Sequence, residues 1–235
     1  MGIYQAWAEE RGSLAQSLGR GALGGSYADG AIILCAAIGA MASLLWKPSS
    51  GTDAKRFVEI VTRFRTGSPD TTRVSAPLLA ADFPQLRDGL GVSEKSLYLR
   101  GHMDKTEADM RTMCAAANIP DGEKAVRRYS YANLLYKQVR CSFIHEYQPG
   151  KSATEGDGLR GIAGVEDNEI SYVNMLEEDD SVPVTKRLIH FPLKWISAVV
   201  LAVAAGIDDE RSKQDKTTLK NLGLPIPDAW WIDGG

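Results

Sequence analysis

The stretch Ala31–Trp46 contains no charged residue, and it constrains the fold more than any other segment of the chain. With the residues that precede it from Tyr27, it predicts a helix that is apolar nearly all round. Such a helix has to be covered by other elements. Its end is predicted by residues 47–51, which are rich in Pro, Ser and Gly. The stretch is shorter than the roughly 20 residues that cross a bilayer, so a membrane span is the less favoured alternative. We therefore expect the central helix of a helical core.

Other helices are indicated by apolar spacing and by stop signals. Phe57, Ile60, Val61 and Phe64 recur at i, i+3, i+4 and i+7, which is typical of an amphipathic helix. Residues 66–120 are rich in Pro and Gly and predict loops and short helices. The expected helices cover residues 3–18, 27–46, 53–65, 104–117, 122–147 and 193–205.

Two strands are predicted before the last helix. Residues 169–175 alternate moderately between apolar and polar side chains, and residues 184–191 are a second candidate strand. The acidic linker 177–180 would form the tip of a hairpin. The sequence thus predicts a mainly α protein, a helical bundle with a small β-hairpin before the last helix. We expect a single domain over residues 1–235, with an irregular insertion around 66–120 and the hairpin around 168–191.

Composition restricts the classes of function. Charged residues make up 24% of the chain and hydrophobic ones 44%, which are ordinary values for a globular protein. The formal net charge is −3, whereas a protein that coats long stretches of nucleic acid normally has a basic excess. The three cysteines are scattered, which favours a reducing compartment. The N-terminus lacks the pattern of a signal peptide. We expect a cytoplasmic protein that does not bind a membrane.

The segment with the most chemical specificity is the C-terminal part of the helix expected at 122–147. It carries Arg140 and, five positions later, His145. The planar fork of arginine suits phosphate oxygens, and histidine can move a proton near neutral pH. On an ideal helix the two side chains point about 140° apart. They can act together if the helix unwinds near Tyr147, or if a second copy of the chain adds its own pair across a two-fold axis.

This segment resembles the HEPN superfamily of small helical proteins, whose signature is an arginine, four to six residues, and a histidine near the end of a core helix. Here it reads Arg140-Cys141-Ser142-Phe143-Ile144-His145. The resemblance implies a dimeric endoribonuclease that needs no metal or other cofactor. His145 would be the general acid or base in attack by the ribose 2′-hydroxyl, and Arg140 would bind the phosphate. It also implies a toxin or defence effector, with an inhibitory or regulatory protein partner.

Three further residues are expected to bind the RNA substrate. Lys137 would attract the phosphate backbone, and Tyr136 and Tyr147 would stack on bases. Arg127 and Arg128 begin the same expected helix, but a solvated helix face is their simpler interpretation.

Two alternatives remain open. One is a catalytically inactive HEPN-like module that binds RNA, a nucleotide or a protein partner through the same surface. Cys141, where a polar residue is common, and Gly39, where an acid is common, favour it; the spacing and helix-end position of His145 favour catalysis. The other is a purely structural all-α interaction protein.

A metal site is not expected. Cys141 and His145 have the i, i+4 spacing of two ligands, but zinc needs two more, and His102, Cys114 and His190 lack paired spacing. The glycines at 19–25 lack the Gly-Lys-Ser/Thr of a phosphate-binding loop and predict a connector.

Overall fold

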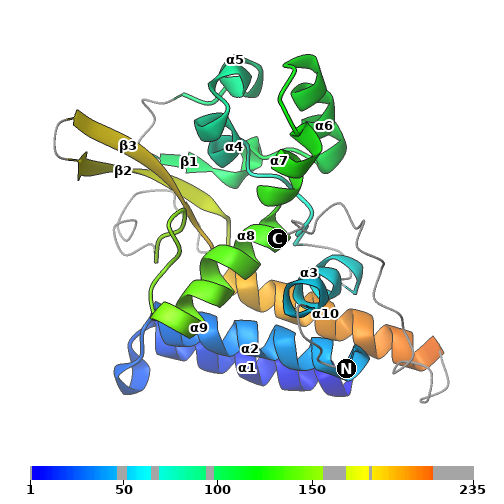
Figure 1. Ribbon diagram of the computed structural model, residues 1–235. Helices are drawn as coiled ribbons and strands as arrows, with labels where there is room; N and C mark the ends of the chain where they lie inside the picture. The colour runs from blue at the N-terminus through cyan, green and yellow to red at the C-terminus, as the bar shows by residue number, and fades with distance from the viewer. Residues whose placement is uncertain are drawn as a thin grey trace.

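Figure 1 presents the computed structural model, which describes residues 2–46, 52–64, 69–93, 98–155, 168–179 and 182–213. These residues are mainly helical, with a small three-stranded antiparallel sheet. The predicted class and the hairpin before the last helix are therefore confirmed. The α-helices are α1 (Ile3–Gly19), α2 (Tyr27–Leu45), α3 (Asp53–Arg63), α4 (Ala76–Asp82), α5 (Arg87–Leu90), α6 (Glu107–Ala116), α7 (Gly122–Arg128), α8 (Tyr131–Leu134), α9 (Ser142–Glu146) and α10 (Leu193–Lys213). Short 3₁₀ turns are η1 (Ala22–Gly24), η2 (Pro84–Leu86) and η3 (Gly101–Met103), and η4 (Leu135–Cys141) is a π-helix.

Helix α2 lies in the core, as its uncharged sequence predicts. It packs against α1, α3 and α10, and α1, α2 and α10 run alongside one another in Figure 1. Its start is fixed by a capping box, in which the hydroxyl of Ser26 accepts a hydrogen bond from the backbone N–H of Asp29 and the Asp29 carboxylate accepts one from that of Ser26. Among the described helices, α2 alone is long and apolar enough to cross a membrane, and 56% of that apolar window is buried inside the protein.

The sheet has one strand more than the sequence predicts. Strands β2 (Ser171–Asp179) and β3 (Val182–His190) form the expected hairpin, with Ser171 opposite His190. Strand β1 (Tyr98–Arg100) pairs with the start of β2, giving the order β1-β2-β3. Three residues are too few to show the alternation by which a strand is predicted.

The prediction of a single helix over residues 122–147 is wrong. In the structure this segment is divided at Ser130, which has an extended backbone and whose side chain caps the start of α8. The backbone N–H groups of Tyr131 and Ala132 bind the carbonyls of Arg73 and Thr71. Because the loop before α4 satisfies these donors, the chain can turn between α7 and α8. The break places Tyr131 at the beginning of a new helix.

Candidate functional site

The helix that bears Arg140 and His145 is continuous from Tyr131 to Glu146, and its middle is π-helical. It runs from α8 through η4 to α9, in front of α2 in Figure 1. A π-helix bonds residues five apart and leaves carbonyl groups that need other donors. The hydroxyl of Ser142 donates to the carbonyl of Lys137 at 3.2 Å, and the N–H of Gly150 donates to that of Gln138 at 2.9 Å. The chain after α9 therefore stabilises the π-helical segment.

Arg140 is held on the side of α3. Its Nη1 lies 2.7 Å from Oδ2 of Asp53, in the first turn of that helix. The guanidinium carbon lies 5.2 Å from the ring centre of Tyr136 and 5.7 Å from that of Phe57. The Arg140 side chain is 17% exposed, so part of its charge still faces solvent. Arg140 is thus positioned by one carboxylate and two aromatic rings.

His145 is exposed on the last turn of α9. Among the residues that the structure describes, no hydrogen bond or ion pair joins it to Arg140 or to any other side chain. The imidazole is therefore accessible to solvent protons and to a second molecule.

Tyr147 ends the helix in a left-handed conformation, with φ of 53°. Its hydroxyl donates to Oδ1 of Asp29 at 2.7 Å, across the start of α2. This hydrogen bond, together with those from Ser26, lowers the pKa of the Asp29 carboxyl. Tyr147 is predicted to bind substrate, which stays a prediction; in the structure its hydrogen bond connects the end of the helix that bears Arg140 and His145 to α2.

The other two predicted substrate-binding residues differ in exposure. Lys137 is exposed, whereas Tyr136 is half-buried and its hydroxyl donates to Asp53 at 3.1 Å. Burial raises the pKa of the Tyr136 hydroxyl above its ordinary value. Tyr136 therefore supports Arg140 and Asp53, and its ring is already covered on one side by the guanidinium.

Two cysteines, Cys35 and Cys141, lie near Arg140. Cys35 of α2 is buried, and this burial raises the pKa of its thiol to about 12. Cys141 is half-buried. Within the described part of the chain, no group of three or more His, Cys, Asp or Glu side chains could hold a metal ion.

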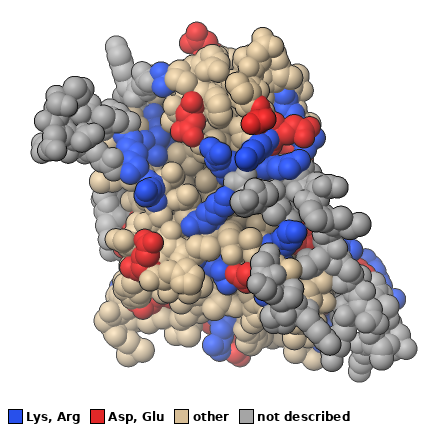
Figure 2. All heavy atoms as spheres, viewed as in Figure 1, with Lys and Arg blue, Asp and Glu red and all other residues tan. Residues whose placement is uncertain are grey.

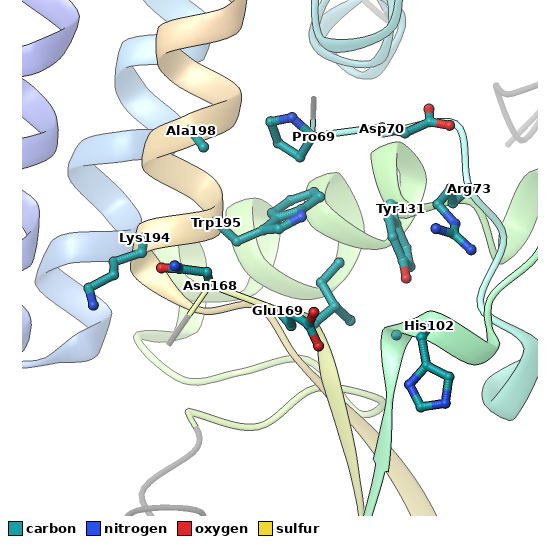
Figure 3. Close-up of a pocket in the computed structure, with 12 residues that line it drawn as sticks. Pro69, Asp70, Arg73, His102, Tyr131, Asn168, Glu169, Lys194, Trp195 and Ala198 are labelled. Atoms are coloured by element: carbon teal, nitrogen blue, oxygen red, sulfur yellow. The ribbon is translucent and has the colours of Figure 1, made fainter. Parts of the chain in front are cut away.

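A second candidate site is a pocket at the other end of the motif helix. It has a volume of about 620 Å³, within the roughly 300–1,000 Å³ typical of small-molecule sites. The start of α8, the first two turns of α10, η3, the loop before α4 and the loop before β2 all contribute to it (Figure 3). The polar and aromatic groups in its wall are Asp70, Arg73, His102, Tyr131, Asn168, Glu169, Lys194 and Trp195.

Behind the pocket wall lies a buried carboxylate, that of Asp104. It accepts hydrogen bonds from the hydroxyls of Tyr131 and Tyr172 and from the backbone N–H of Ala76. Burial raises the pKa of Asp104 to about 7, and the hydrogen bonds oppose this rise. The network holds the Tyr131 ring in the pocket wall.

Sequence reasoning missed this pocket. Its residues come from five segments, and the partners of Asp104 lie 27 and 68 positions away along the chain. One signal was available: serine is favoured at helix N-caps, so Ser130 could have placed Tyr131 at a helix start. No sequence pattern pairs that tyrosine with Asp104.

Comparison of the chain with models of protein families, with curated proteins and with solved structures gives no match.

Proposed function

We propose that the chain is a HEPN-like endoribonuclease that acts as a homodimer and needs no metal. The observation that carries the proposal is the exposure of His145 on the last turn of the helix that also bears Arg140. A histidine buried against apolar side chains could not reach a phosphodiester. An exposed imidazole can do so once a second copy of the chain brings it close to a fixed cation.

The surface of α2 supports a dimer next to this helix. Counting about 100° per residue, Ala36, Ala40 and Ser43 lie on one side of α2, and all three are exposed and uncharged. A Cβ atom added at Gly39 would meet nothing within 4 Å, so a neighbouring helix could approach closely there. On α9, Ile144 is 42% exposed. An uncharged helix face of this kind is typical of a contact between helices.

The proposed chemistry uses one motif from each copy. One His145 takes the proton from the 2′-hydroxyl, whose oxygen attacks the adjacent phosphorus. The P–O bond to the 5′-oxygen breaks, and the other His145 gives a proton to that oxygen. The products are a 2′,3′-cyclic phosphate and a 5′-hydroxyl. Arg140, fixed by Asp53, stabilises the negative charge of the pentacoordinate phosphate with its remaining N–H groups.

Cleavage of RNA by the purified chain in the presence of EDTA tests the proposal. His145→Ala should reduce the rate by at least about 100-fold, the range of general acid–base catalysis. Arg140→Ala should reduce it as well. Glu146→Ala is the exposed control for His145→Ala, and Arg11→Ala, at a half-buried arginine of α1, is the control for Arg140→Ala. Wild-type rates in both motif variants would show that the mechanism is wrong.

The non-catalytic HEPN-like module remains the second candidate, and the Asp53 ion pair favours it. A carboxylate 2.7 Å from Nη1 already occupies one of the donors that would bind phosphate. In that case the wild-type chain would bind RNA, a nucleotide or a protein partner without cleaving RNA. For the active form, we propose a toxin or defence effector in the cytoplasm, restrained by a protein partner.

A further inference from the structure

The carboxylate of Asp53, in the first turn of α3, is the point on which three hydrogen-bond donors converge. Nη1 of Arg140 lies 2.7 Å from its Oδ2, and the Tyr136 hydroxyl donates to the same oxygen at 3.1 Å. Nη2 of Arg56 lies 3.5 Å from Oδ1. The Asp53 side chain is nevertheless 45% exposed. An anion that reaches the remaining N–H groups of Arg140 must therefore lie beside this carboxylate.

Arg56 is the second arginine that contacts Asp53, and it is buried. Its side chain is only 9% exposed. Its Nη1 donates to the backbone carbonyl of Trp46 at 3.2 Å and to the hydroxyl of Ser43 at 3.4 Å, both at the end of α2. Because a buried cation is costly unless it is paired, Arg56 and Asp53 stabilise one another. Arg56 thus holds the Asp53 carboxylate in place from the side of α2.

The charges in contact at this place suit one class of phosphate better than another. Two guanidinium groups and one carboxylate meet there. A phosphodiester within an RNA strand carries a single negative charge, whereas a phosphate monoester carries about −1.5 to −2 at neutral pH. The extra charge of a monoester at Arg140 would lie close to the Asp53 carboxylate. Like charges a few Å apart repel, so the monoester is disfavoured relative to the diester.

The surrounding surface carries cations for the rest of an RNA strand. Lys and Arg side chains gather in a band across the middle of the face shown in Figure 2, at the level of β1, α7 and α8 in Figure 1. Lysine and arginine attract a nucleic-acid backbone independently of its sequence. The Asp53 carboxylate therefore acts on the one phosphate that reaches Arg140, while the remainder of the strand is attracted elsewhere on this face.

We infer that Asp53 is a specificity-determining residue of the phosphate site: it lets an internal phosphodiester bind Arg140 and disfavours a terminal phosphate monoester or inorganic phosphate. The inference rests on the proposed function, in which Arg140 binds a phosphate of RNA, and it adds the class of phosphate that is accepted. Selection of this kind places an unfavourable charge against the competing ligand, which is a common source of specificity.

Competition for a labelled 2′-O-methyl oligoribonucleotide tests the inference on the full chain. This probe has the phosphodiesters of RNA but no attacking hydroxyl, so fluorescence anisotropy measures binding without cleavage. For the wild type, inorganic phosphate at pH 8 should displace the probe no better than chloride of equal ionic strength. Asp53→Asn keeps the size of the side chain and removes its charge. In that variant the inhibition constant of phosphate, corrected for probe affinity, should fall by at least about tenfold.

Two substitutions control for the charge and for its place. Asp53→Glu retains the charge and should keep the selectivity of the wild type. Asp88→Asn removes an exposed carboxylate from α5 and should leave the inhibition constant of phosphate unchanged. A second measurement needs no variant: a 3′-terminal phosphate added to the oligonucleotide should not tighten its binding to the wild type.

Three results would overturn the inference: equal inhibition constants of phosphate for the wild type and Asp53→Asn, tighter binding of the 3′-phosphorylated oligonucleotide to the wild type, or no binding of the probe. The proposed cleavage can fail separately. A chain that binds the probe with the expected selectivity and leaves ordinary RNA intact would support the role of Asp53 and contradict the ribonuclease.

Discussion

Asp104 is an acid whose surroundings set a pH dependence for the whole fold. Its pKa is raised to about 7 by burial, so the folded state holds the proton more strongly than the unfolded state does. Stability should therefore fall as the pH rises from about 4 to about 7 and level off above that. At about 1.4 kcal/mol per pKa unit, the fall amounts to a few kcal/mol.

Urea unfolding between pH 4.5 and 8 checks this prediction. The difference in unfolding free energy between wild type and Asp104→Asn should shrink or reverse as the pH rises, because the variant cannot ionise. Tyr172→Phe removes one hydrogen-bond donor to the Asp104 carboxylate and so should raise the pKa of that group further. The fall in stability should then occur at higher pH. Parallel pH curves for all three proteins would contradict the assignment.

The stability that Asp29 contributes has the opposite pH dependence, because hydrogen bonds from Tyr147 and Ser26 lower the pKa of its carboxyl. The stability that it contributes is present above its ordinary pKa and is lost as the pH falls through the lower, folded value. Tyr147→Phe should raise the Asp29 pKa toward its ordinary value. A carboxyl titration by NMR measures this directly; an unchanged Asp29 pKa would mean that the hydrogen bond is absent in solution.

Among the elements, the π-helical segment depends on the turn that follows it. A Cβ atom at Gly150 would lie 2.3 Å from Oε1 and 2.9 Å from the Cα of Gln138, so alanine cannot fit without displacing backbone. Gly150→Ala should destabilise the fold by about 1–3 kcal/mol through loss of its hydrogen bond to the Gln138 carbonyl.

Gly39→Ala is the matched substitution, and it should change the free energy of unfolding in the opposite direction. Gly39 is inside α2 and has open space around it, so alanine should stabilise the monomer by about 0.5–1 kcal/mol. Thermal unfolding of the two variants separates the effects. Equal shifts in Tm would show that the close approach at Gly150 plays no part.

Elements with strong local signals were predicted well. The apolar run of α2 and the i, i+3, i+4 spacing of α3 each predict the buried face that the helix has in the structure, and the hairpin of β2 and β3 pairs as expected. The break at Ser130 was missed because the backbone N–H groups that follow it bind carbonyls far away in the sequence, those of Arg73 and Thr71. The π-helix was missed for a similar reason, since its freed carbonyl is bound from Gly150.

For the molecule as a whole, the proposed dimer is the property to measure. Ala40→Arg places a charge on the exposed, uncharged face of α2 and should leave the monomer folded while separating the dimer. RNA cleavage should fall with it. Ala115→Arg, on the exposed side of α6, is the control. Sedimentation that shows a monomer for the wild type would contradict the dimeric site.

At the same scale, the sequence identified one candidate site and not the other. Arg140 and His145 are close in sequence, so their spacing could be recognised as a motif. Arg73, His102, Tyr131 and Glu169 lie in segments that only the folded chain brings to one pocket. The ion partner of Arg140 could not be predicted from the sequence either, because Asp53 lies on a different helix.

The π-helical segment also determines the direction in which the side chains of α9 face relative to those of α8. A π-helix accommodates an extra residue compared with an α-helix of the same hydrogen-bonded path. If the seven residues of η4 were wound as an α-helix instead, the extra residue would turn the part beyond them by about 100° relative to Tyr131. Arg140 would then leave Asp53, and His145 would leave the side of α2 on which it now lies. The π-helical winding of η4 thus determines which way the motif faces.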